Sequence, residues 1–229
     1  RLNTTVAETD DHLNNYRIPE AAKSLSTFVD ELSNWYVRRC RERFWGKDMT
    51  DDKIAAYMTL YTCLVTIAKA AAPMIPFMAE DMYQNLVRTV DKSAPESVHL
   101  CDYPVSDAAY IDRALEDDME FILSVVVLGR SARNGANIKN RQPLDAMYVK
   151  TDRTVSEYYR EIVEDELNVK RVEFVRDVSA FSSYTFKPQL KTVGPKYGKL
   201  LGKIKAALTA LDGNAAKREL DESGALRLD

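Results

Sequence analysis

The stretch NWYVRRCRERFW, residues 34–45, places two tryptophans, a tyrosine and a phenylalanine among four arginines. Its apolar positions continue a repeat of three and four residues that starts upstream with Leu25, Phe28 and Leu32. This spacing predicts one amphipathic helix of about 26 residues, which Gly46 ends. A single helix cannot bury such an apolar stripe by itself, so the stretch predicts a bundle of helices.

Further helices are predicted on both sides of this one. Residues 1–15 form the first, because residues 16–19 interrupt its pattern and Pro19 suits the start of the next helix. Thr50 is a predicted N-cap followed by two acids, and Pro73 closes the third helix that it begins. The buried stripe of this third helix is expected to comprise Ile54, Tyr57, Met58, Tyr61, Leu64, Val65 and Ala68. One side of a fourth helix, opened by Pro76, is expected to comprise Phe77, Met82, Tyr83, Leu86 and Val87.

The sequence changes in character after residue 105. The segment SVHLCDYP (97–104) is expected to cross the bundle in extended form, and a fifth helix is expected from Asp107 through FILSVVVLGRSARN. β-Branched and aromatic content then predicts strands at DAMYVK (145–150), NVKRVEFV (168–175) and SSYTFK (182–187), with helices at TVSEYYREIVEDEL (154–167) and KLLGKIKAALTAL (199–211). The predicted fold class is mainly α, a helix bundle followed by a small α+β domain. The expected domains are a bundle at 1–105, a connecting helix and basic loop at 106–142, and a small α+β domain at 143–229, truncated at its C-terminus.

Composition limits the class of protein. The 229 residues carry a net charge of -3 with a pI near 5.6, which argues against coating nucleic acid by bulk charge. Cys40, Cys63 and Cys101 are widely spaced, which indicates free thiols in a reducing cytosol. No apolar run approaches the roughly 18 residues of a membrane span, so a soluble, cytoplasmic protein without membrane contact is expected. The chain starts inside a helical pattern and ends in the strand-like Leu226-Arg-Leu-Asp, which predicts a piece of a longer protein.

The end of the quoted stretch is the first candidate binding site. Trp35 continues the apolar stripe and is expected in the core, whereas a helix end beside a glycine offers little burial to a second indole. This helix end holds Arg43, Phe44, Trp45 and Lys47. Exposed rings beside cations suit single-stranded nucleic acid, because bases stack on the rings and phosphates meet the cations. The alternative is an ordinary solvated helix face, and Glu42, four residues after Arg38, accounts for part of the charge in this way.

Two further basic runs lack acids altogether. The run GRSARNGANIKNRQP (129–143) holds Arg130, Arg133, Lys139 and Arg141. The run from residue 187 to residue 205 holds six lysines, among them Lys196 and Lys199. Segregated positive charge in a net acidic chain favours contact with a polyanion over a random solvated face.

Other motifs point away from catalysis. GPKYGK (194–199) has one residue too few for a phosphate-binding loop and has Leu200 where Ser or Thr should follow, so its glycines predict a turn with positive φ. His99, Cys101 and Asp102 lack a fourth metal ligand, so no metal site is expected. No Gly-x-Ser-x-Gly nucleophile, dinucleotide fingerprint or Ser/His/Asp constellation occurs, so no catalytic residue is expected in these 229 residues.

Six motifs together resemble a known family. They are NWYVRRCRERFW, PMIPFMAEDMYQNLV, SVHLCDYP, GRSARNGANIKNRQPL, ELNVKRVEF and FKPQLKTVGPKYGKLLGKI. Across nearly the whole chain they are similar to the C-terminal region of the isoleucyl-tRNA synthetase family. The resemblance implies a class I aminoacyl-tRNA synthetase of protein biosynthesis, an isoleucine-tRNA ligase, in which this region is the anticodon-binding domain.

The resemblance also implies where the chemistry occurs. Such an enzyme ligates isoleucine to tRNA(Ile) with ATP and Mg, but the His-Ile-Gly-His and Lys-Met-Ser-Lys-Ser signatures are absent from this sequence. The catalytic and editing domains are therefore expected before Arg1, and no cofactor is expected in this region. A tryptophan of the related methionyl enzymes stacks on the anticodon, which implies the same role for Trp45. The expected tRNA-binding residues are Arg39, Arg43, Phe44, Trp45, Lys47, Arg130, Arg133, Lys139, Arg141, Lys196 and Lys199.

The expected partner is tRNA(Ile), bound by a cytoplasmic monomer. The principal alternative is a non-catalytic helical scaffold that binds another protein or braces neighbouring domains. A further alternative is the same region of a valyl-type synthetase.

Overall fold

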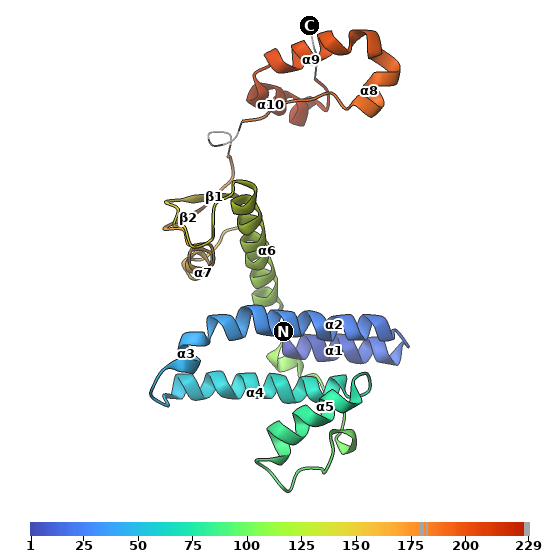
Figure 1. Ribbon diagram of the computed structural model, residues 1–229, viewed down its shortest axis with the longest axis vertical. Coiled ribbons are helices and arrows are strands. Elements are labelled where there is room, and N and C mark those ends of the chain that lie inside the picture. Colours follow the sequence, from blue (N-terminus) through green and yellow to red (C-terminus); the bar gives the residue numbers. More distant parts are fainter. Residues whose placement is uncertain (179–180, 182, 227–229) are drawn as a thin grey trace. The chain divides into compact units, whose positions relative to one another are not determined.

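The computed structural model describes residues 1–178, 181 and 183–226. The chain forms two compact units, which divide between Asp117 and Asp118. The fold is mainly α, with a helix bundle in the first unit and a two-stranded parallel sheet among helices in the second (Figure 1). The predicted fold class is therefore confirmed.

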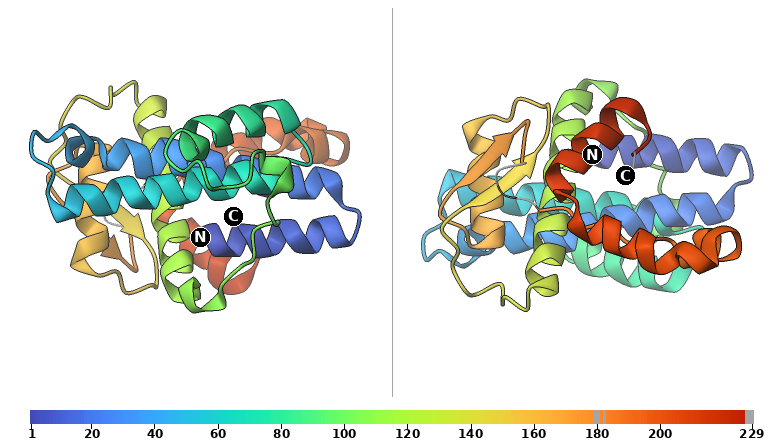
Figure 2. Two further views of the ribbon diagram at one scale, coloured as in Figure 1. Left: turned by 90° about the horizontal axis from the view of Figure 1, so that it is seen from below. Right: turned by 90° about the horizontal axis from the view of Figure 1, so that it is seen from above.

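The first unit is built from five α-helices. They are α1 (Leu2–Asn14), α2 (Ile18–Glu31), α3 (Arg41–Trp45), α4 (Asp51–Ala71) and α5 (Pro76–Tyr83). Helices α1, α2 and α4 run in alternating directions and pack along their lengths (Figures 1 and 2). Their core contains Phe28 and Leu32 from one side of the bundle and Cys63 and Ile67 from the other. The helix boundaries follow the predicted punctuation, since Thr50 caps α4 by accepting a hydrogen bond from the Lys53 amide at 3.2 Å.

The predicted helix of about 26 residues is interrupted. Helix α2 passes into a π-helical segment, Leu32–Val37, and a turn at Cys40 separates this segment from α3. A π-helical turn closes over five residues instead of four, so it rotates the side chains that follow relative to the apolar stripe. As a result Trp35, expected in the core, is only half-buried, and the guanidinium groups of Arg38 and Arg39 each lie 5.8 Å from its ring.

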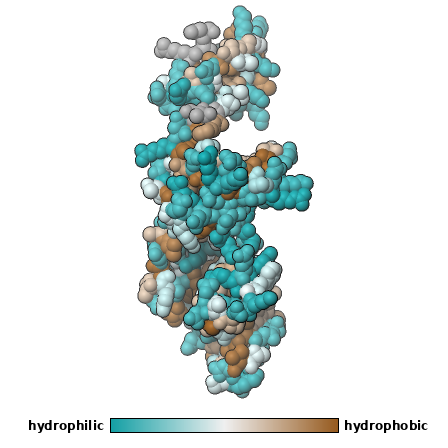
Figure 3. Space-filling view, turned by 90° about the vertical axis from the view of Figure 1, so that its left-hand side faces the viewer, coloured by the Kyte–Doolittle hydropathy of each residue, from teal (hydrophilic) through white to brown (hydrophobic). Residues whose placement is uncertain are grey.

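The predicted stripes of α4 and α5 are partly wrong. Ile54, Tyr57, Met58 and Phe77 are exposed, Phe77 by 90%, so the predicted apolar stripes are wider than the faces that these helices bury. Helix α5 buries Tyr83, as predicted, and also Ala79, beside a second α-to-π transition at Gln84–Arg88. Figure 3 shows apolar residues in brown among the hydrophilic ones on one face of the bundle unit, in the lower part of the view.

Judged only by length and composition, helix α4 could cross a membrane. It is the one such helix among the residues that the structure describes. The central helix of a soluble bundle passes the same test. Cys63, Ile67 and Ala70 of α4 are buried against the rest of the bundle. The expectation that no segment reaches such a length therefore does not hold for this helix.

The segment after α5 crosses the bundle largely without regular structure, as predicted, apart from 3-10 turns at Val98–Leu100 and Ala108–Tyr110. Glu80 fixes its start by accepting hydrogen bonds from the Ser97 hydroxyl at 2.8 Å and the Val98 amide at 2.9 Å. The hydrogen bond from the Ser97 hydroxyl, together with the one from the Val98 amide, holds the pKa of the Glu80 carboxyl below its usual range.

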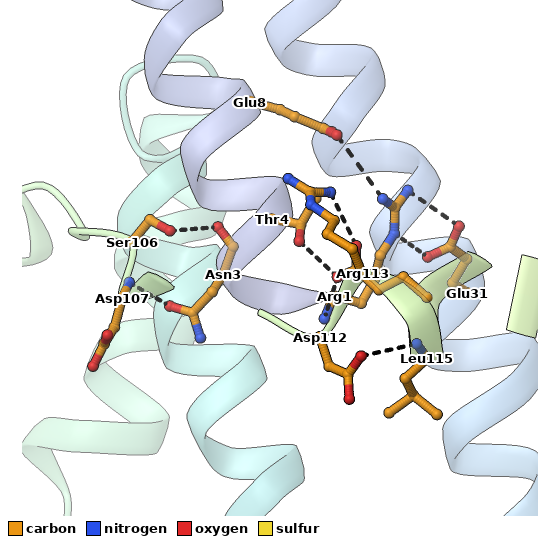
Figure 4. A network of polar contacts seen from close by, with 11 residues as sticks. Arg1, Asn3, Thr4, Glu8, Glu31, Ser106, Asp107, Asp112, Arg113 and Leu115 are labelled. Atoms are coloured by element: carbon orange, nitrogen blue, oxygen red, sulfur yellow. Dashed lines mark hydrogen bonds and ion pairs between the residues drawn. The ribbon is translucent and has the colours of Figure 1, made fainter. Parts of the chain in front are cut away.

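Asn3 of α1 fixes the far end of this segment. Its carbonyl accepts from the Ser106 hydroxyl at 2.8 Å, and its side-chain oxygen accepts from the Asp107 amide at 2.9 Å (Figure 4). Thr4 donates to Glu116 at 2.6 Å in the same network. These bonds hold the segment that leads into α6 against α1.

The second unit contains most of α6 (Arg113–Gly135), then β1 (Met147–Lys150), α7 (Glu157–Leu167) and β2 (Val172–Val175). The strands pair in parallel, with Met147 opposite Val172, and α7 connects them as a βαβ unit. Gly129 permits a close approach of α6, because a Cβ there would lie 2.3 Å from a methyl group of Leu167. The two predicted strands and the helix between them are confirmed.

The last helices are α8 (Leu190–Tyr197), α9 (Leu201–Ala210) and α10 (Gly213–Ser223). Helix α9 confirms the prediction for 199–211, but residues 183–187 form no strand, and Ser182 lies outside the described residues. The predicted turn with positive φ at GPKYGK is also wrong, because Gly194 lies within α8 and Gly198 has a φ of -52°. Of the strand-like ending expected at residues 226–229, residues 227–229 fall outside the described residues.

Candidate nucleic-acid interface

The first predicted site lies where α3 meets the start of α4, and residues 40–57 are called the α3 corner below. Phe44 packs between two tyrosines, with its ring centroid 6.4 Å from Tyr36 and 4.9 Å from Tyr57. The Tyr36 hydroxyl donates to the Ala56 carbonyl at 3.1 Å, and the Tyr57 hydroxyl donates to the Phe44 carbonyl at 3.3 Å. This aromatic cluster fastens α3 to α4.

Arg43 is committed to the same junction. Its Nε and Nη2 donate to the two carboxylate oxygens of Asp52 at 2.7 Å each, and Nη2 also reaches the Asp52 carbonyl at 3.1 Å. A third nitrogen, Nη1, lies 3.4 Å from the sulfur of Cys40. The hydrogen bonds to Asp52 raise the pKa of Arg43 above its already high value. Arg43 therefore braces the corner from within, since its guanidinium is directed at Asp52, whereas the sequence analysis expected it to contact tRNA.

The loop between α3 and α4 is tied down as well. Lys53 donates from Nζ to the Gly46 carbonyl at 2.5 Å, at the point where α3 ends. Together with the N-cap at Thr50, this bond holds both ends of the loop against the first turn of α4. The end of α3 is thus held against α4 by packing and hydrogen bonds.

Trp45, the last residue of α3, projects from this junction into solvent. Its side chain is 75% exposed, although it is one of the largest apolar groups in the chain. The guanidinium carbon of Arg41 lies 5.2 Å from the centroid of its ring, a distance typical of a cation–π contact. A rigid helix end therefore presents an exposed indole with a cation beside it. That combination stacks an unpaired base and attracts its phosphate.

The structure separates the predicted residues of this corner. Trp45, Lys47 and Arg39 are exposed, whereas Phe44 is half-buried in the aromatic cluster and so offers no open ring face. Arg41, which is not among the predicted tRNA-binding residues, supplies the cation at the indole. The sequence signal that could have identified Arg41 is its spacing of four residues from Trp45, because residues four apart on a helix lie on one face.

The second basic run is largely used inside its own unit. Arg133 is only 4% exposed, and its guanidinium donates to the carbonyls of Lys139, Gln142 and Asn168 at 3.1, 2.9 and 3.0 Å. Because its side chain is buried and its donors are directed at these backbone carbonyls, Arg133 is removed from the candidate interface.

Arg130 pairs with the buried side chain of Glu166 at 2.7 Å, so its charge too is balanced within the unit. Lys139 and Arg141 are exposed. Of this run, these two keep their places in the candidate interface.

The third run offers cations on helical segments. Lys196 lies in the last turn of α8 and Lys199 in the 3-10 turn Gly198–Leu200, and both side chains are exposed.

No group of three or more potential ligands for a metal ion is found among the residues that the structure describes.

Comparison with known proteins points in the same direction. A family model for the anticodon-binding domain of tRNA ligase matches residues 1–149. The isoleucine–tRNA ligase of Clostridium novyi is 52% identical over 212 residues, which cover 93% of this chain and 20% of that protein. That of Clostridium acetobutylicum is 48% identical over the whole chain and 22% of its own length, and that of Porphyromonas gingivalis is 38% identical over the whole chain. The chain spans about a fifth of the length of these curated relatives.

Proposed function

The chain belongs to the anticodon-binding domain family of tRNA ligases, and from this membership we propose that it binds tRNA(Ile) through the α3 corner. In this proposal an unpaired base of the anticodon loop stacks on Trp45, and Arg41 and Lys47 meet neighbouring phosphates. Arg43 and Phe44 position the indole from within.

The whole protein, on this proposal, ligates isoleucine to tRNA(Ile) in the cytoplasm. ATP and Mg are used in a part of that protein outside these 229 residues. The contribution of this chain is to hold the anticodon end of the substrate. Lys139, Arg141, Lys196 and Lys199 add phosphate contacts.

One observation supports the proposal most strongly, the 75% exposure of Trp45 on a braced helix end. Exposing an indole forgoes roughly 2 kcal/mol of burial, which a bound base would restore. Arg41, four residues before Trp45, also supplies the cation that attracts the phosphate of the stacked base.

The test compares two exposed aromatic residues of the same unit. Trp45→Ala should weaken binding of tRNA(Ile) about 10- to 100-fold in a filter-binding assay at low salt, since stacking contributes roughly 1–3 kcal/mol per base. Phe77→Ala is the matched control, because Phe77 is 90% exposed on α5, away from the α3 corner. Trp45→Phe should retain part of the affinity. None of these substitutions should change the midpoint of thermal unfolding by more than about two degrees, because the side chains of Trp45 and Phe77 are exposed.

Equal affinity of the Trp45→Ala and Phe77→Ala variants would refute the stacking role of Trp45. A larger loss with Phe77→Ala would move the interface to α5. A scaffold that binds protein instead of RNA would show no affinity difference between tRNA(Ile) and a polyanion such as heparin at matched charge.

A further inference from the structure

The two-stranded sheet of the second unit has two different faces. Successive side chains of a strand point to opposite faces of its sheet, so each face takes every second residue. Met147 pairs with Val172 on the face that packs against α6, where Met147 lies beside Gly129. The opposite face, called the Tyr148 face below, carries Tyr148 and Lys150 of β1 with Glu173 and Val175 of β2.

The ring of Phe181 lies on the Tyr148 face. The amide of Phe181 donates to the Val178 carbonyl at 2.9 Å, which closes a turn after β2. The ring centroids of Phe181 and Tyr148 are 4.0 Å apart and their planes are inclined by 14°, so the two rings are stacked. Tyr148 is half-buried, whereas Phe181 is 60% exposed. The second unit therefore presents the outer face of a supported aromatic ring to solvent.

Charges of both signs surround the stacked pair. Arg171 lies 3.5 Å from the Glu173 carboxylate and 3.7 Å from that of Asp145. In the strands and the two residues on either side of each, the cations are as many as the acids, namely Lys150, Lys170, Arg171 and Arg176 with Asp145, Asp152, Glu173 and Asp177. Because these charges balance, the sheet does not attract a phosphate by an excess of positive charge. Its distinctive feature is the pair of rings.

A flat apolar ring with a polar rim suits a nucleobase, because a base stacks by its faces and forms hydrogen bonds by its edges. The Tyr148 face supplies such a rim, since Lys150 donates hydrogen bonds and Glu173 accepts them. We propose that an unpaired base of the bound tRNA stacks on the outer face of Phe181, with Tyr148 supporting that ring on its other face. The inference rests on the proposed function and adds a base contact to a unit for which it proposes phosphate contacts alone.

The test measures tRNA(Ile) binding by Phe181 variants of the 229-residue chain. Phe181→Ala should weaken binding about tenfold, the contribution of one stacked base, and leave the slope of log K against log salt unchanged. Phe181→Tyr should bind like the wild type. Phe181→Leu should lose as much affinity as Phe181→Ala, because leucine covers Tyr148 but offers no flat ring. Tyr158→Ala is the matched control and should leave the affinity unchanged, since Tyr158 is a 66% exposed residue of α7 whose ring meets Tyr159 at 60° without stacking.

Other outcomes overturn this inference and separate it from the proposed function. If Phe181→Ala and Tyr158→Ala bind alike while Trp45→Ala still weakens binding, Phe181 does not contact RNA and the α3 corner does. If Phe181→Leu binds as tightly as the wild type, the ring of Phe181 serves only to cover Tyr148. A loss of affinity together with a salt slope lower by about 0.9 would assign a phosphate contact in place of a stacked base. If the unaltered chain fails to bind tRNA, the proposed function and the base contact fail together.

Discussion

The α3 corner and the basic run at residues 129–143 look alike as sequences but use their arginines in different ways. Each was expected to face RNA with a cluster of cations. In the α3 corner, Arg43 pairs with Asp52 while Trp45 and Arg41 remain outside the junction. In the run at 129–143, the two arginines that lie on α6, Arg130 and Arg133, are engaged inside their own unit.

The difference shows what an internal arginine does in each unit. Arg43 is about one-third exposed and pairs with an Asp52 that is two-thirds exposed, so solvent screens the pair and its main effect is to orient α3. Arg133 is almost completely buried and satisfies three carbonyls that have left regular structure. The first arginine positions a candidate site, whereas the second maintains the fold of its unit.

The largest expected effect follows from Arg133. Arg133→Ala removes three hydrogen bonds from a buried guanidinium to backbone carbonyls, which should lower the free energy of unfolding of the second unit by about 3 kcal/mol. Amide hydrogen exchange at the buried Val163 and Leu167 measures this loss locally. Arg141→Ala, which removes an exposed arginine of the same run, is the control and should change exchange little. Similar protection in the two variants would show that Arg133 is not a structural residue.

A smaller effect separates positioning from contact at Arg43. If Arg43 only braces α3, Arg43→Ala and Asp52→Asn should both weaken tRNA binding about three- to tenfold, because each loosens the support of Trp45. Each should cost at most about 1 kcal/mol of stability, since the pair is screened by solvent. If Arg43 contacts RNA directly, Asp52→Asn should strengthen binding, because it releases the guanidinium and removes a negative charge. The sign of the Asp52→Asn effect in a filter-binding assay therefore decides the role of Arg43.

Local signals in the sequence predicted much of the first unit and the βαβ element of the second. Prolines and the Thr50 cap marked helix boundaries, and β-branched runs on either side of a helical pattern marked the βαβ element. These signals depend on residues within one or two turns, so they can be recognised without knowing the fold. The exposure of Trp45 was predicted by the same kind of reasoning, from a bulky side chain at a helix end beside Gly46.

The errors involve partners that are distant along the chain. Arg133 meets the carbonyl of Asn168, and Arg43 meets Asp52 across a loop, so neither role could be derived from the basic runs themselves. Phe77 fits the apolar spacing of α5, but spacing does not indicate which side of a helix has a neighbour. The break between α2 and α3 depends on a π-helical turn, which the periodicity of the stretch does not encode.

The smallest expected effect concerns Lys139 and Arg141, the two cations of the run at 129–143 that are exposed. If they meet RNA phosphates, Lys139→Ala and Arg141→Ala should each weaken tRNA binding about two- to threefold and lower the salt slope by at most about 0.9. The loss should be equal for cognate and non-cognate tRNA, because phosphate contacts carry no base information. Lys92→Ala, an exposed lysine of the first unit, is the control for loss of charge alone. Effects no larger than that of the control would mean that this run serves its own unit alone, so that only the α3 corner of the two regions binds RNA.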